Sequence, residues 1–165
     1  MIIKDYEFLD IVEDILENKQ FKRLKEMGHH GCNRFDHSLK VSYYSYKVSK
    51  FLGLDYYETA RAALIHDFFF TKNDRNAKEF ILSNFTHPKE AVNNSMKYFS
   101  ISEKEKNIIL SHMFPLVLYL PKYSESWIVN MVDKLVATQE WSYTFSYKLR
   151  NATTLIGLFI INIFK

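Results

Sequence analysis

Residues 54–69 read LDYYETARAALIHDFF, and this stretch carries the signals of a complete helix. Asp55 and Glu58 have the three-residue spacing of a capping box, which satisfies free backbone N–H groups at a helix start. The residues that follow recur at helical spacing: Ala60, Ala63 and Leu64. The last turn of the predicted helix carries His66 and Asp67. The stretch therefore predicts a helix that ends in an imidazole beside a carboxylate.

Helical spacing also precedes this stretch. The N-terminal segment predicts an amphipathic helix, broken near Asn18 and ended by Gly28, with an apolar face made of Phe8, Ile11, Val12, Ile15 and Leu16. Asp36 is the predicted N-cap of the next helix, which Gly53 stops. The inward face of that helix is predicted to hold His37, Val41, Tyr44, Val48 and Phe51.

Further helices are predicted after the stretch. Asp74 is expected to cap a short helix, and Pro88 is expected to lie in the first turn of the next one. Ser102 and Glu105 form a second capping-box pattern. Ser124 is predicted to open a helix that points Ile128, Val132 and Leu135 inward, with Asp133 near its middle.

The last segment, residues 141–165, is expected to form one or two helices that close the bundle. No stretch alternates between apolar and polar residues as a strand would, so we predict an all-α fold. The chain has 165 residues, 47% hydrophobic and 25% charged, which is the size and balance of one globular domain.

Charge and composition narrow the class of protein. A net charge of +3 is too small for a duplex nucleic-acid binder. The single Cys32 cannot form an internal disulfide, and the acidic N-terminus does not resemble a signal peptide, so we expect a cytoplasmic protein. The apolar run 155–164 is shorter than the ~20 residues needed to cross a bilayer, so we expect a packed helix and no membrane span.

A buried carboxylate is the first sign of a metal site. Asp133 lies among apolar residues at 128–135, and a buried carboxylate needs a partner. Imidazole and carboxylate ligands together suit iron, manganese, zinc or a related ion. Taken alone, His87 or His112 would more often be a hydrogen-bonded core histidine. The order of the histidines and aspartates along the chain, all at predicted helix positions, favours the metal.

That order resembles a known motif. Arg34-x-x-His37, the pair His66-Asp67, and Asp133 in VDKL resemble the H…HD…D motif of the HD superfamily of metal-dependent phosphohydrolases, which have an all-helical fold. More narrowly, blocks such as RFDHSLKVSYYSY and EKNIILSHMFPL are similar to small bacterial HD-domain proteins that are predicted hydrolases. The resemblance implies a single HD domain over 1–165, with a motif-bearing core at about 28–140 and both terminal helices packed on it.

The resemblance also implies a ligand set. A first metal would be bound by His37, His66, Asp67 and Asp133. A second would be bound by His87 and His112, with the carboxylate of Asp67 bridging the two ions. Two divalent ions are expected, of iron, manganese, zinc, cobalt or nickel, and a metal-bound hydroxide would attack the phosphate. Asp67 is therefore also the expected catalytic residue.

Residues around the ligands are weaker candidates. Arg34 could hold a substrate phosphate, or it could be merely solvated or salt-bridged. Lys134 is a weaker candidate for binding substrate, and His30 is expected in a second layer around the ligands. The chain departs from the family after the HD pair: it reads HDFFFTK, where many HD proteins carry a glycine and a phosphate-binding lysine close behind.

The resemblance favours one function and leaves two others open. We expect hydrolysis of a phosphate ester of a small molecule, with a nucleotide as the leading substrate class. Some HD proteins with the same six ligands instead use two irons to activate dioxygen and oxidise a substrate carbon. The third possibility is a metal-binding or nucleotide-binding module without turnover.

Overall fold

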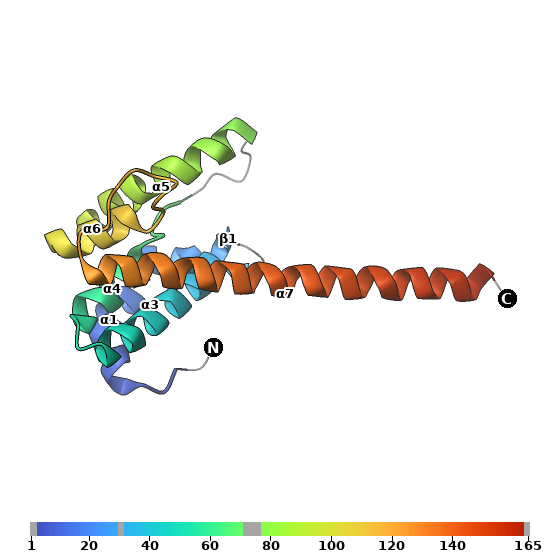
Figure 1. Cartoon of the computed structure of the whole chain (residues 1–165), viewed down its shortest axis with the longest axis horizontal. Coiled ribbons are helices and arrows are strands. Elements are labelled where there is room, and N and C mark those ends of the chain that lie inside the picture. Colours follow the sequence, from blue (N-terminus) through green and yellow to red (C-terminus); the bar gives the residue numbers. More distant parts are fainter. Residues whose placement is uncertain (1–2, 30–31, 71–76, 164–165) are drawn as a thin grey trace.

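The computed structural model describes residues 3–29, 32–70 and 77–163, with side chains at 3–27, 33–70 and 85–147. Its elements are α1 (Tyr6–Glu17), α2 (Lys19–Lys22), η1 (Arg23–Glu26), β1 (Gly28–His29), β2 (Cys32–Asn33), α3 (Arg34–Phe51), α4 (Tyr56–Ile65), α5 (Ala77–Tyr98), α6 (Glu103–Ser111) and α7 (Ser124–Ile163). Helices α1 to α6 gather around the first part of α7 (Figure 1). The predicted all-α single domain is confirmed.

Several local signals act as predicted. The side chain of Asn18 accepts from the backbone N–H groups of Gln20 and Phe21, which separates α1 from α2. Gly53 ends the turn after α3 with a φ of +67°, a conformation that glycine adopts without strain. Ser102 and Glu105 form a complete capping box at the start of α6. The ends of α1 and α3 and the start of α6 therefore lie at the predicted capping residues.

The start of α3 differs from the prediction. Asn33, rather than Asp36, is the N-cap, and its side chain accepts from the backbone N–H of Asp36. The amide of Asn33 in turn donates to the Asp36 carboxylate at 2.8 Å. Asp36 thus acts as the third residue of a reciprocal cap. The helix begins one turn earlier than expected, and His37 lies in its second turn.

The inward face of α3 also differs. Beyond Val41, three of the buried side chains are small and polar: Ser42, Ser45 and Ser49. The fourth is the large ring of Tyr46. The predicted Tyr44, Val48 and Phe51 are exposed instead. Small residues let α3 lie close to the alanines of α4, and the Ser42 hydroxyl donates to the Ala60 carbonyl at 2.7 Å. Close packing of the α3 and α4 backbones explains why small serines, and not Tyr44, Val48 and Phe51, are buried on this face.

Two further predictions fail in the middle of the chain. Pro88 lies inside the continuous helix α5 and does not open a new helix. The helix loses only one N–H donor at this residue, and the hydrogen bonds on either side keep it together.

A two-residue antiparallel pair joins β1 to β2, in which Gly28 is opposite Asn33. It is too short to show the alternating pattern of a strand. Asp74, the predicted cap, lies outside the described residues.

Helix α7 is longer and straighter than expected. Leu135, predicted to point inward, is exposed. The core face holds Val132, as predicted, together with Val129 and Val136. The helix continues past residue 141 without a break and runs away from the other helices in Figure 1, which differs from the expected closing of the bundle. Among the described residues, no helix combines the length and apolar character needed to cross a membrane.

Candidate metal centre

All six predicted ligands are buried in the middle of the bundle. They come from five segments: His37 from α3, His66 and Asp67 from the end of α4, His87 from α5, His112 from the end of α6, and Asp133 from α7. Burying so many ionisable groups in one place is costly unless they satisfy one another or bind a shared partner. Their convergence is therefore the first structural sign of a site.

The ligand atoms form two triads that could each hold a metal ion. The first consists of His37, His66 and Asp133, and the second of His66, Asp67 and His112. Within each triad the candidate ligand atoms lie within 4.8 Å of one another. In the first, Asp133 Oδ1 is 3.0 Å from His37 Nε2 and 3.5 Å from His66 Nε2.

Asp67 lies between the two groups of histidines. Its Oδ1 is 3.4 Å from His87 Nε2 and 3.7 Å from His112 Nε2, whereas its Oδ2 faces His66 Nε2 at 4.0 Å. A carboxylate can bind a different ion through each oxygen. The Nε2 atom of His66 has a single lone pair and cannot be shared in that way. The two triads share only His66, whereas Asp67 belongs to the second triad and also faces His66. With its two oxygens, Asp67 is therefore the residue suited to bridge.

The helix ends orient two of the imidazoles. His66 and His112 are the C-cap residues of α4 and α6, where backbone carbonyls lack helical partners. Each ring donates its Nδ1–H to the carbonyl three residues earlier, Ala63 or Ile109, at 2.7 Å. This leaves the Nε2 lone pair of the neutral ring facing the centre. The buried Nε2 of His66 makes no hydrogen bond with any described residue.

His87 and His112 face each other closely. Their Nε2 atoms are 2.9 Å apart, so one of the two must carry a hydrogen when no other group lies between them. The ring of His87 also stacks on that of Phe69, with centroids 4.8 Å apart. Two ring nitrogens directed at the same carboxylate oxygen are in the arrangement that a metal ion requires of its ligands.

The charges of the centre are strongly coupled. Burial lowers the pKa of His37, but its hydrogen bonds to Asp133 and Glu140 outweigh burial and raise the pKa to about 10. Burial raises the pKa of Asp133, yet the histidine partners, led by His37, hold it well below the usual range. Burial, His66 and His87 together lower the pKa of His112 to about 3. The proton held between His37 and Asp133 is one that a metal ion would displace.

Glu140 is a site residue that the sequence analysis missed. Its buried carboxylate accepts from His37 Nδ1 at 2.9 Å and from Lys40 Nζ at 2.7 Å. Carboxylates that hold the second nitrogen of a metal-binding histidine fix its orientation. The available signal was the position of Glu140, two helical turns after Asp133 and on the same face.

Lys134 and Asn130 support the backbone beside His112. The Asn130 amide donates to the carbonyls of His112 and Phe114 at 2.7 and 2.8 Å. Lys134 Nζ donates to the His112 carbonyl at 3.1 Å, and burial lowers the pKa of its ammonium. The structure therefore places the ammonium of Lys134, a predicted substrate contact, against the backbone.

Arg34 is buried, so its interpretation as a solvated residue is wrong. Its guanidinium lies over the Phe69 ring, 3.8 Å from the centroid, and donates to the Phe69 carbonyl at 2.6 Å. Its Nε is 3.9 Å from Asp67 Oδ2. The positive charge thus lies beside the proposed bridging carboxylate. His30 and Lys72 lie outside the residues whose side chains are described.

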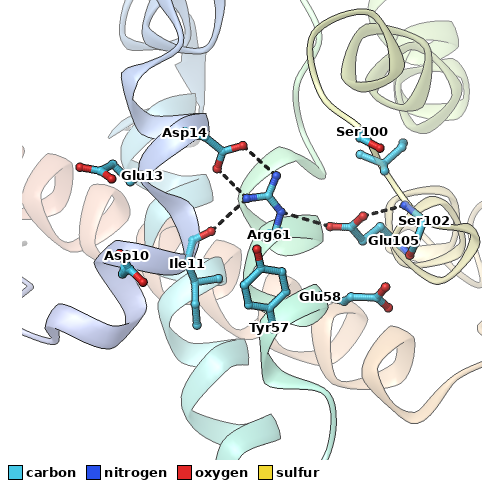
Figure 2. Close-up of a pocket in the computed structure, with 11 residues that line it drawn as sticks. Asp10, Ile11, Glu13, Asp14, Tyr57, Glu58, Arg61, Ser100, Ser102 and Glu105 are labelled. Atoms are coloured by element: carbon cyan, nitrogen blue, oxygen red, sulfur yellow. Dashed lines mark hydrogen bonds and ion pairs between the residues drawn. The ribbon is translucent and has the colours of Figure 1, made fainter.

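A pocket of about 600 Å³ lies at the opposite end of α4 (Figure 2). Its centre is Arg61, which donates to Asp14 and to the Ile11 carbonyl and lies 3.6 Å from Glu105. None of the six candidate ligands lines this pocket. Its arginine links α1, α4 and α6, so we interpret the cluster as structural.

No protein-family model matches the chain, and no curated protein matches it. The site itself and the order of its residues in the sequence are therefore the guides to function.

Proposed function

We propose that this protein is a metal-dependent phosphohydrolase of the HD type, which cleaves a phosphate ester of a small molecule, with nucleotides as the leading substrate class. The observation that carries the proposal is the position of Asp67. Its carboxylate lies between two groups of imidazoles and beside a buried arginine. A bridging carboxylate of this kind is what a pair of divalent ions needs between them.

The donor set fits transition metals. Nitrogen and carboxylate donors together suit iron, manganese, zinc, cobalt or nickel, whereas magnesium and calcium prefer oxygen donors alone. His37, His66 and Asp133 would hold one ion, His87 and His112 the other, and Asp67 would contribute to both. The buried Nε2 of His66, which makes no hydrogen bond to a described residue, supports this fit because a ligand nitrogen must keep its lone pair.

Metal ions bound in such a site make water a stronger nucleophile at neutral pH and neutralise charge on phosphoryl oxygens. Residues of the chain would orient the metal ligands and attract the substrate. Glu140 holds His37 through Nδ1, so that Nε2 faces the centre. Arg34 adds a positive charge next to Asp67, which favours an anionic substrate at this side of the site.

Metal analysis of anaerobically purified protein tests the proposal first. We expect about two ions per chain, followed by release of phosphate from monoesters, or of a monoester and an alcohol from diesters, in a substrate screen with the metal found. At most one ion after careful reconstitution would contradict the two-metal site. Oxygen consumption with oxidation of a substrate carbon and no phosphate release would replace the proposal with the oxygenase alternative.

Single-ligand variants test the division of the site. His87→Ala should lose the second ion and keep the first, whereas His37→Ala should lose the first and keep the second. The measurement is metal stoichiometry after reconstitution, with circular dichroism to check that the helices persist. Equal loss of both ions in the two variants would show that the sites are not independent.

A further inference from the structure

The two parts of α7 have very different surroundings. Up to Glu140, one face of the helix is buried against the bundle and carries Val129, Val132, Asp133 and Val136. After Glu140, the aromatic side chains that the structure describes are all exposed: Trp141, Tyr143, Phe145 and Tyr147. Figure 1 shows this second part running away from the other helices. A lone helix in water is marginally stable, so its apolar surface requires a partner.

The exposed side of α7 carries a regular apolar seam. Starting at Ile128, which is partly buried and packs against the core, alternate steps of three and four residues reach Met131, Leu135, Thr138, Ser142 and Phe145. The same steps continue in the sequence through Leu149, Ala152, Ile156, Phe159 and Ile163. All these positions are apolar except Thr138 and Ser142, and none is charged. A seam of this spacing that lasts more than three or four heptads is the pattern of a coiled coil.

The described part of the seam is open to solvent. Met131, Leu135 and Phe145 expose 60%, 68% and 56% of their surface. They lie on the side of α7 opposite Val129, Val132 and Val136, which face the bundle. Trp141 flanks the seam and stacks on Phe145, with ring centroids 5.7 Å apart. A stacked Trp–Phe pair on an exposed helix face is the type of anchor found at the centre of protein interfaces.

We infer that the chain self-associates through this seam, with α7 of one copy packed along α7 of a second copy as a two-helix coiled coil. A second copy is the partner that the pattern favours, because it brings an identical uncharged seam with the same spacing. The seam from Ile128 to Ile163 is about 50 Å long at 1.5 Å per residue. That length exceeds the minimum for a stable coiled coil.

The aromatic residues of the seam region supply a substantial part of the area that a stable dimer buries. An aromatic side chain buries about 150–250 Å² when fully covered. With little more than half of that surface still exposed, Trp141 and Phe145 from two copies would together bury roughly 350–600 Å². This is up to about a third of a standard interface of roughly 1,600 Å². Met131, Leu135 and the rest of the seam would add to it.

Charge is compatible with two identical helices. The acidic residues of α7 are Glu125, Asp133 and Glu140, and all three are buried on the bundle side. The basic residues after Glu140, Lys148 and Arg150, lie off the seam in the heptad pattern. Pairing the seams therefore buries no charged residue.

Sedimentation equilibrium of the full-length protein tests this inference. We expect the wild-type protein to reach twice its 19.7 kDa mass over a concentration series. Replacing Leu135 and Phe145 together by glutamate should give a monomer, with the dissociation constant raised about 30-fold or more. Metal content should not change, because neither residue contacts the metal centre.

Tyr143→Glu is the matched control. Tyr143 lies in the same part of α7 and is 70% exposed, but it is off the seam. This variant should remain dimeric. A wild-type protein that stays monomeric, or equal dissociation of the Tyr143→Glu variant, would overturn the inference. Binding of a monomeric wild-type protein to vesicles of equal parts phosphatidylcholine and phosphatidylserine would overturn it in favour of a lipid surface.

Discussion

Helix α4 carries charged side chains at two places, but it uses them differently. In the middle of the helix, Arg61 is surrounded by Asp14, Glu105 and a backbone carbonyl, so a cation lies among acceptors (Figure 2). At the C-terminal end, imidazole nitrogens converge on Asp67 and on one another. Two Nε2 atoms are only 2.9 Å apart there, and another makes no hydrogen bond to a described residue.

This difference separates a structural cluster from a candidate metal centre. Groups of opposite charge that satisfy one another gain nothing from a ligand. Imidazole nitrogens and carboxylate oxygens that face a common point could instead hold a cation, because each offers a lone pair. The first three of the four predictions below therefore pair a residue at the metal centre with one of the same type at the Arg61 cluster, and the fourth concerns the metal centre alone.

The largest effect is expected from Asp67→Ala. Removing the bridging carboxylate should release both ions and lower kcat/KM by about 1,000-fold or more, since the metals supply several kcal/mol to the reaction. Elemental analysis and steady-state kinetics measure this. Asp14→Ala should keep both ions and lose only about 0.2–1 kcal/mol of stability, as expected for an exposed ion pair. Full metal content and activity in Asp67→Ala would rule out the HD assignment.

A smaller effect is expected from Arg34→Ala. If the guanidinium binds a substrate phosphate, kcat/KM should fall by about 10- to 150-fold, the value of a charge-assisted contact of about 1.5–3 kcal/mol. Metal stoichiometry should be unchanged because a guanidinium is not a ligand, and Arg34→Lys should recover part of the activity. Arg61→Ala should instead lower the melting temperature and leave kcat/KM intact. Unchanged kinetics in metal-loaded Arg34→Ala would make Arg34 a purely structural partner of Phe69 and Asp67.

Glu140→Gln should weaken the ion held by His37 by about 10- to 100-fold, the usual cost of losing a carboxylate that orients a ligand histidine. Titration against a chelator of known affinity measures the change. Glu105→Gln removes another buried carboxylate, one that contacts Arg61 and the α6 cap, and should leave the affinity unchanged. An equal loss in both variants would indicate a general effect on folding.

The smallest effect concerns the pH dependence of stability in metal-free protein. His112, with a pKa lowered to about 3, stays neutral in the fold while the unfolded chain takes up a proton below about pH 6.5. Stability should therefore fall as pH drops from 6.5 towards 3. His37, with a pKa raised to about 10, stabilises the fold fully below about pH 6.5, and this contribution is lost as pH rises to 10.

Stability should thus be greatest near pH 6.5. Thermal unfolding at a series of pH values measures it, and the loss between pH 6.5 and 5 should be smaller in His112→Asn. A variant whose acid limb matches the wild-type limb would show that His112 is not the group responsible.

Short-range signals in the sequence predicted much of the fold. Asn18, Gly53 and the Ser102–Glu105 box act through neighbouring backbone groups, so their effects can be recognised without knowledge of other helices. The residues of the candidate metal centre were also named from the sequence, through its resemblance to the HD motif, and the structure brings them together. Whether the site turns over a phosphate ester stays a prediction.

Contacts between segments distant in the chain decided which other residues are buried or belong to the site. Glu140 becomes a site residue only because α3 brings His37 against α7, 103 positions away in the chain. The serine face of α3 is buried because α4 packs closely on it, and Arg34 is buried because Phe69 covers it.

Helix α7 shows clearly which features follow from the sequence and which follow from tertiary packing. Its start at Ser124, its helical character and its two apolar faces follow from residue order alone. Periodicity cannot say which apolar face meets the bundle, since valine and leucine both suit a core. The sequence placed Val132 inside, but only the packed structure places Val136 inside and Leu135 outside, because the Asp133 side chain must reach the histidines and thereby sets the rotation of the helix.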